Sequence, residues 1–134
     1  MTEVDNSAAQ GCGEWNTAGG NNTQDRIFLL SWAEASRYFG AIELEKENVQ
    51  ARTEPTAYAV SRGAVPNSKD KTENGADAVP WWLRSPGMNQ MSAICVYNDG
   101  SMVFGNVIGG HTCVRPALWI DPESEIFKSE NPRD

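Results

Sequence analysis

Short apolar runs, separated by glycine-rich or polar stretches, dominate the middle of the chain, and no heptad or internal repeat appears. Runs of this kind between turn-forming residues are typical of buried strands. We expect strands in five of them, at residues 25–30, 81–83, 93–97, 101–104 and 114–120. Between the third and the fourth, Asn98-Asp99-Gly100 predicts a tight hairpin turn, because Asp-Gly accepts the positive φ angles that such turns need.

One helix is predicted over residues 32–39. Ser31 and Glu34 have the spacing of a capping box, in which each side chain accepts a hydrogen bond from the other residue's backbone N–H. Gly40 follows at the position where a helix commonly ends with a positive φ.

A second short helix is predicted over residues 56–62, because Pro55 stands at its start and Gly63 just past its end. A strand is the alternative for this segment.

Four segments are too polar to predict much regular structure. Residues 1–24 are expected to be a loop or tail, and residues 122–134 a C-terminal tail. Residues 41–54 are expected to be a surface connection with an extra helical turn near 44–49. Residues 66–78 are expected to be a mobile loop, which leaves one domain over residues 25–121.

Charge and composition exclude several classes of partner. The 134 residues carry a formal net charge of −7, which opposes binding to nucleic acid or to an anionic membrane. No apolar run approaches the roughly 20 residues needed to cross a bilayer, and the first residues lack the basic-then-apolar order of a signal peptide. We expect neither nucleic acid nor membrane insertion.

Candidates for catalysis or metal binding are few. Cys12, Cys95 and Cys113 include no C-x-x-C pair, and both a Cys95–Cys113 disulfide and two buried free thiols remain open. His111, the only histidine, lies in a Gly-Gly-His-Thr turn, and an exposed turn residue is favoured over a nucleophile pair with a cysteine. Asn98 and Asp99 offer oxygen ligands to Ca²⁺, but the turn explains them without a metal. We expect no cofactor.

Aromatic and arginine side chains concentrate in two segments, with Trp81, Trp82 and Arg84 in one and Arg115 and Trp119 in the other. A guanidinium among aromatic rings both stacks and donates through a fixed fork of N–H groups. We interpret these residues as structural, with a ligand contact as the alternative.

Four segments together resemble a bacterial family catalogued as domain-of-unknown-function family 6273: DRIFLLSWAEASRYF (25–39), PTAYAVSRGA (55–64), WWLRSPG (81–87) and VRPALWI (114–120). The resemblance implies an α+β, C-type-lectin-like fold of the formylglycine-generating-enzyme type, with a short twisted antiparallel sheet, two short helices and long loops. Family members commonly have a further strand and helix upstream, so we expect this chain to lack that segment.

Some relatives of this family are variable proteins of diversity-generating retroelements, in which the stretch between the last two motifs carries the diversified side chains. Carried onto this sequence, the resemblance implies a set of ligand-binding positions at Met88, Asn89, Gln90, Met91, Tyr97, Asn98, Ser101, Phe104, Asn106, Ile108 and His111. It implies a scaffold made of the two motifs with Ala93, Val96, Gly100, Gly105 and Val107. Cys113 departs from the glycine usual at its position.

We therefore expect a non-catalytic binding module that presents residues 88–112 to a protein or glycan ligand. The resemblance implies a location at the cell surface, outside the cell or on a phage particle. Two alternatives remain: a copper-dependent oxidase of the formylglycine-generating type that uses Cys95 and Cys113, and a purely structural module of a larger surface protein.

Overall fold

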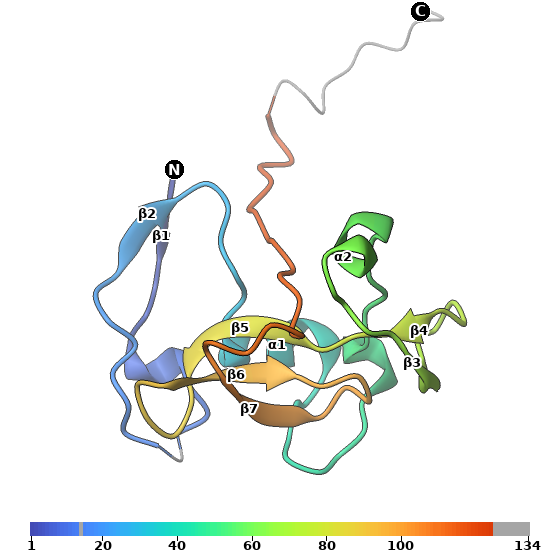
Figure 1. The fold of residues 1–134 in the computed structure, drawn as a ribbon. Helices are drawn as coiled ribbons and strands as arrows, with labels where there is room; N and C mark the ends of the chain where they lie inside the picture. The colour runs from blue at the N-terminus through green and yellow to red at the C-terminus, as the bar shows by residue number, and fades with distance from the viewer. Residues whose placement is uncertain (14, 125–134) are drawn as a thin grey trace, which may run out of the picture.

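The computed structural model describes residues 1–13 and 15–124, and it has an α+β architecture of short helices and small antiparallel sheets (Figure 1). The central sheet has the strand order β5-β6-β7 and is formed by β5 (Trp81–Pro86), β6 (Ser92–Val96) and β7 (Met102–Asn106). Two smaller sheets pair β1 (Thr2–Val4) with β2 (Thr23–Asp25) and β3 (Asn67–Lys71) with β4 (Asp77–Ala78). The helices are α1 (Trp32–Phe39) and α2 (Ala57–Ser61), with 3-10 turns η1 (Ala8–Gln10) and η2 (Val49–Ala51).

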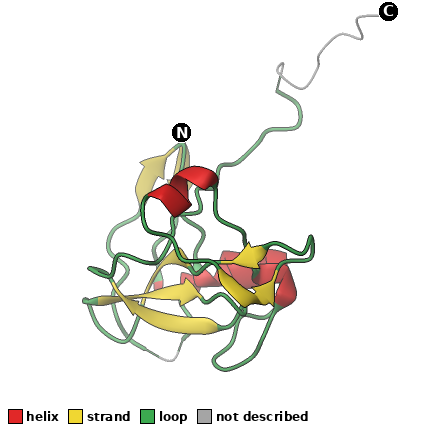
Figure 2. Cartoon of the chain, turned by 45° about the vertical axis from the view of Figure 1, so that its right-hand side comes forward, coloured by secondary structure: helices red, strands yellow, loops and turns green. Residues whose placement is uncertain are grey.

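One face of the central sheet forms the core. Alternate residues of β5 are buried, as expected for a strand that packs one face against a core. Trp81 and Leu83 of β5 pack there with Ile94 and Val96 of β6 and with Ala35 of α1. The short elements around this core are joined by long loops (Figure 2).

Two tryptophan N–H groups tie the segment after α1 to this core. Trp81 Nε1 donates to Ala51 O at 3.0 Å, and Trp32 Nε1 donates to Ile42 O at 2.8 Å. A buried indole N–H needs such an acceptor, because leaving it unpaired costs free energy. Most of residues 41–54 lie at the surface as expected, but Ile42 and Ala51 are fully buried and attach this connection to the core. Its helical turn is η2 rather than residues 44–49.

Both predicted helices are confirmed. Ser31 and Glu34 form the capping box of α1, and Gly40 follows with φ of 88°. The side chain of Thr56 caps α2, and Gly63 follows it with φ of 110°.

The three predicted strands of the central sheet are confirmed as β5, β6 and β7, and the Asn98-Asp99-Gly100 turn joins the last two. The other two apolar runs do not form strands as expected. Residues 25–30 leave the strand after Asp25, and residues 114–120 contribute only an isolated bridge, Phe28 with Ala117. In the described residues, residues 26–30 and 114–120 make no strand pairing beyond this bridge, so they lack the ladder of backbone hydrogen bonds that defines a strand.

The expected mobile loop at residues 66–78 is instead the β3–β4 hairpin. Polar contacts hold it, because Arg52 Nη1 donates to Lys71 O at 3.0 Å and Asn98 Nδ2 donates to Asp70 Oδ2 at 3.1 Å. Lys71 and Asp77 form an ion pair across the hairpin. The pattern of apolar residues does not reveal side-chain hydrogen bonds to distant segments, so it did not predict this hairpin. Of the expected C-terminal tail, residues 125–134 lie outside the described residues.

Gly100 is the glycine on which the central hairpin most depends. It has φ of 89°, and a Cβ added there would lie 1.9 Å from Asn48 O. The backbone of Asn48 lies this close because its N–H donates to Asp99 O at 3.0 Å. We predict that Gly100→Ala lowers the free energy of unfolding by about 2–5 kcal/mol, from the left-handed backbone and the clash together.

The measurement is urea denaturation followed by tryptophan fluorescence. Gly110→Ala is the matched control, because Gly110 is exposed and has no atom within 4 Å of an added Cβ. A Gly100→Ala protein as stable as the control would show that the Asn48 contact is absent in solution.

Candidate functional site

The structure divides the predicted ligand-binding positions by exposure. Eight of them are exposed, which are Met88, Asn89, Gln90, Met91, Tyr97, Asn106, Ile108 and His111. These eight do not form one cluster. Most lie at the end of the central sheet where β5 turns into β6 and β7 ends, whereas Tyr97 and His111 border a separate hollow.

Two predicted positions are buried, contrary to the expectation of an exposed surface. Asn98 and Ser101 are only 6% and 4% exposed, because the turn between β6 and β7 folds against neighbouring segments. Asn98 donates to Asp70 of the β3–β4 hairpin, and Ser101 N donates to Asp99 Oδ1 at 2.9 Å. They serve the architecture of the turn rather than its surface.

Phe104 and Val107 also differ from their expected roles. Phe104 is half-buried, and its ring meets Trp15 edge to face with centroids 5.7 Å apart. Val107, expected in the scaffold, is exposed. Trp15 lies in a segment that the sequence reading treated as a tail, so it was missed as a neighbour of the predicted surface.

Apolar side chains of the N-terminal segment, of the loop before β6 and of the end of β7 lie near this sheet end, and all but the half-buried Phe104 are exposed. We call this set the end patch, and it consists of Trp15, Met88, Met91, Phe104, Val107 and Ile108. Val107 N donates to Met91 O at 3.0 Å, which joins the end of β7 to the loop before β6. Phe104 lies beside that loop, because a Cβ at Gly87 would come within 3.2 Å of its ring. Ile108 is 88% exposed and Met91 is 67% exposed.

Arg84 of β5 holds the N-terminal segment, which also carries Trp15 of the end patch. Its guanidinium donates to Asp5 O at 2.8 Å, to Asn6 Oδ1 at 3.1 Å and to Leu29 O at 2.8 Å. It also makes a bidentate pair with Glu34 of α1, with Nη2–Oε1 at 2.9 Å. One guanidinium therefore joins β5, α1 and two loops through its fixed fork of donors.

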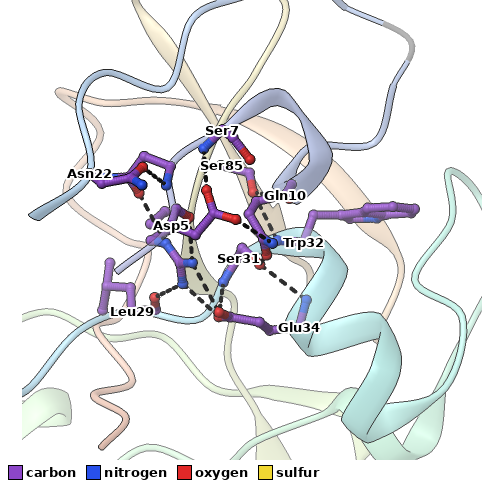
Figure 3. Close-up of polar contacts among 11 residues, drawn as sticks. Asp5, Ser7, Gln10, Asn22, Leu29, Ser31, Trp32, Glu34 and Ser85 are labelled. Carbon is purple, nitrogen blue, oxygen red and sulfur yellow. Dashed lines mark hydrogen bonds and ion pairs between the residues drawn. The ribbon is translucent and has the colours of Figure 1, made fainter. Parts of the chain in front are cut away.

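Further hydrogen bonds around this guanidinium complete the attachment. Ser85 Oγ donates to Gln10 O and accepts from Trp32 N, both at 2.8 Å, and Ser31 Oγ donates to Gln10 Oε1 at 2.7 Å (Figure 3). Gln90 Nε2 in turn donates to Ala18 O at 3.2 Å. The segment 1–24, expected to be a loop or tail, is instead built into the domain with β1, η1 and β2.

The pKa values of two carboxyl groups reflect these contacts. Burial by itself raises the pKa of Glu34, but the hydrogen bonds from Arg84 and from Ser31 N and the charge of Arg84 outweigh it, so this pKa lies below its usual value. Hydrogen bonds from Ser7 hold the pKa of Asp5 below its usual value as well.

The second arginine, Arg115, is stacked between two rings. Its guanidinium carbon lies 4.7 Å from the centroids of both Phe39 and Trp81, and desolvation lowers its pKa. This contact joins the 114–120 segment to α1 and β5. Trp119 is half-exposed and meets Tyr38 with ring centroids 6.4 Å apart.

Two hollows flank His111. One has a volume of about 410 Å³ and lies between residues 65–68 and the end of β6, where Tyr97 and Asn98 line it. The other has a volume of about 310 Å³ and lies between α2 and residues 110–114. His111 lines both, so they are neighbours on one surface.

The cysteines are free thiols, and the geometry explains why Cys95 and Cys113 do not bond. Cys95 pairs with Trp82 on one side of β5, whereas Cys113 bridges to Trp81 on the other. Two strand spacings separate their Cα atoms by about 9–10 Å, beyond the limit of about 7 Å for a disulfide. Burial raises the pKa of Cys95 to about 11 and raises that of Cys113 as well.

Within residues 1–13 and 15–124, no group of three or more His, Cys, Asp and Glu side chains is placed to hold a metal ion. Asp99, considered as a calcium ligand, uses its Oδ1 to accept from Ser101 N. No helix in the described part of the chain is long and apolar enough to cross a membrane.

Comparison with known proteins gives one family. The model described as Domain of unknown function (DUF6273) matches residues 2–122. No curated protein and no solved structure matches the chain.

The Glu34–Arg84 pair generates a prediction about stability. We expect Glu34→Gln to lower the free energy of unfolding by about 1–2 kcal/mol at pH 7, since it removes a largely buried, charge-assisted pair in which the Glu34 side chain is 20% exposed. Because the pKa of folded Glu34 is depressed, its contribution is present above the pKa of the unfolded chain and is lost as pH falls through the folded value. The difference between the two proteins should shrink as pH falls below about 4.

Urea denaturation at pH 7 and at pH 3 measures this difference. Glu43→Gln is the control, since Glu43 pairs with Lys46 on the surface. A Glu34→Gln deficit that stays constant over this pH range, or equals that of Glu43→Gln, would contradict the prediction.

Cys95 generates a second prediction. At pH 8 a thiol with a pKa of about 11 is ionised in roughly one molecule in a thousand. We expect iodoacetamide to alkylate Cys95 at least about 100-fold more slowly in the folded protein than in urea, because the thiolate is the nucleophile. Peptide mass spectrometry over time measures each site, with half-buried Cys12 as the internal reference. Equal rates at Cys95 in the folded and unfolded chains would refute the burial described here.

Proposed function

The chain belongs to the family of domains of unknown function DUF6273, and from this premise and the end patch we propose that it is a non-catalytic module that binds a protein ligand. The observation that carries the proposal is the end patch itself, in which exposed methionine, isoleucine and valine side chains lie at the same end of the sheet as the Trp15–Phe104 ring pair. Exposed apolar side chains concentrated at one place on a surface are typical of an interaction site.

The residue types in the end patch suit recognition. Met88 and Met91 are unbranched and polarisable, so they adapt to the shape of a partner. Burying an exposed Ile or Met side chain contributes about 1.5–3 kcal/mol. Trp15 adds a large, rigid aromatic surface at the border, of the type that often anchors an interface.

The surroundings of the end patch keep its residues in fixed places. Loop 88–91 is joined to β7 by the Val107–Met91 hydrogen bond and to the N-terminal segment by Gln90. That segment is in turn held by Arg84. A patch that is already arranged in the free protein loses less conformational entropy on binding.

The same arrangement supports a variable surface on a constant frame, as the family resemblance implies. We expect the exposed positions of the end patch to tolerate side-chain replacement, whereas the burial of Asn98 and Ser101 argues against their belonging to a variable set. A C-type-lectin-like relationship and a location at the cell surface, outside the cell or on a phage particle belong to this proposal.

Thiol chemistry is the less favoured alternative. The oxidase hypothesis needs Cys95 and Cys113 to act together, but β5 lies between them, and burial holds the pKa of Cys95 at about 11. A purely structural module is the other alternative, and it predicts an end patch without affinity for any partner.

We predict that charge in the end patch abolishes recognition. Peptides selected from a phage-displayed random library against the wild-type protein should be rich in aromatic and aliphatic residues. Their Kd, measured with the synthetic peptide, should rise at least tenfold for Met91→Asp and for Ile108→Asp, because each change leaves an apolar contact opposite a charge.

Ile27→Asp is the matched control, since Ile27 is 64% exposed and lies outside the end patch. Circular dichroism confirms that each variant folds. Selection that enriches no peptide, or peptides whose Kd is the same for Ile108→Asp as for wild type, would defeat the proposal in favour of the structural module.

A further inference from the structure

The two hollows beside His111 have a charge pattern unlike that of the rest of the protein. The chain contains 18 acidic and 11 basic side chains. None of the described residues that line either hollow is Asp or Glu, yet Arg62 and His111 are both among them. On a protein with a net charge of −7, a described lining that holds an arginine and a histidine but no carboxylate favours the approach of an anionic group.

The donors in the hollow next to α2 are available to a ligand. Arg62 follows α2 with its backbone N–H bonded to the helix, while its side chain is exposed and makes no ion pair with a described residue. His111 and Thr112 line the same hollow as Arg62. A guanidinium binds a carboxylate through two parallel N–H donors, which fixes both position and orientation.

The walls of the adjoining hollow suit a ring with hydroxyl groups. Tyr97 is half-exposed and lines this hollow, and Asn67 and Ser68 in the same lining carry an amide and a hydroxyl group. A sugar ring packs its C–H face on an aromatic ring while its hydroxyl groups bond to amides and imidazoles. The hollow is open, and its walls mix polar and apolar side chains, which suits a saccharide better than the apolar anchor of a peptide.

From these features we infer that the His111 hollows bind an acidic saccharide, a sugar chain that carries a carboxylate. The carboxylate lies between Arg62 and His111, and the neighbouring sugar ring lies on Tyr97. This site is separate from the end patch and does not depend on the function proposed for it, because the two share no residue.

The test uses the full chain and three acidic oligosaccharides: a tetragalacturonide, a hyaluronan tetrasaccharide and sialyllactose. Binding is followed by isothermal titration calorimetry and by NMR shifts of the His111 imidazole and the Arg62 and Tyr97 amides. We expect at least one of the three to bind saturably with shifts at these residues, and its methyl ester to bind at least tenfold more weakly. The Kd should rise at least tenfold for Arg62→Gln and also increase for Tyr97→Ala.

Arg37→Gln is the matched control, because Arg37 is an exposed arginine of α1 that lines neither hollow. This variant should leave the Kd unchanged. Ile108→Asp should also leave the Kd unchanged, which separates this site from the end patch. The inference is overturned if none of the three saccharides binds saturably, if Arg62→Gln binds as wild type does, or if a hexaglutamate peptide binds more tightly than the best saccharide.

Discussion

The Arg84 guanidinium holds together segments that apolar packing alone would not bring into contact. Its donors reach Glu34 on α1, the carbonyls of Asp5 and Leu29, and the Asn6 side chain. Two of the four partners accept through backbone carbonyls, which are fixed once the chain has folded, so the arrangement is specific in geometry as well as in charge. The N-terminal segment that Arg84 holds also carries Trp15, whose ring packs against Phe104 in the end patch.

The central sheet allows this attachment of the N-terminal segment because β5 makes contacts on both of its faces. On one face Trp81 and Leu83 fill the core with α1 and with residues 42 and 51. On the other face, Trp82 lies close to Gly105, where a Cβ would come within 3.0 Å of its ring, and Arg84 receives the N-terminal segment. A domain of this size has a limited core, so polar anchors fix loops that apolar burial cannot order.

Two surfaces of different chemistry result. The end patch is apolar, and it lies where loop 88–91 meets the end of β7. The His111 hollows mix polar and apolar side chains and have no carboxylate in their described lining, and they lie beside α2 and the end of β6. The segment after β7 connects the two, running from Ile108 in the patch to His111 in the hollows. In the two proposals made above, a single frame presents one surface for a protein and another for a sugar, each with its own residues.

Local signals in the sequence determined the helices, the central strands and their turn. A capping box, a proline before a helix and an Asp-Gly turn act over a few residues, so α1, α2 and the β6–β7 hairpin follow from sequence alone. The exposed positions of the loop 88–91 were also predictable, as residues between two strands.

Only the tertiary structure decided the rest, because it depends on partners far away in the chain. The hairpin at residues 67–78 is ordered by Arg52 and Asn98, and the N-terminal segment by an arginine more than 70 residues away. The burial of Asn98 and Ser101 and the separation of Cys95 from Cys113 by β5 come from the same cause. The pattern of apolar residues predicts which side chains are buried, but it does not predict which carbonyl group a guanidinium will bind.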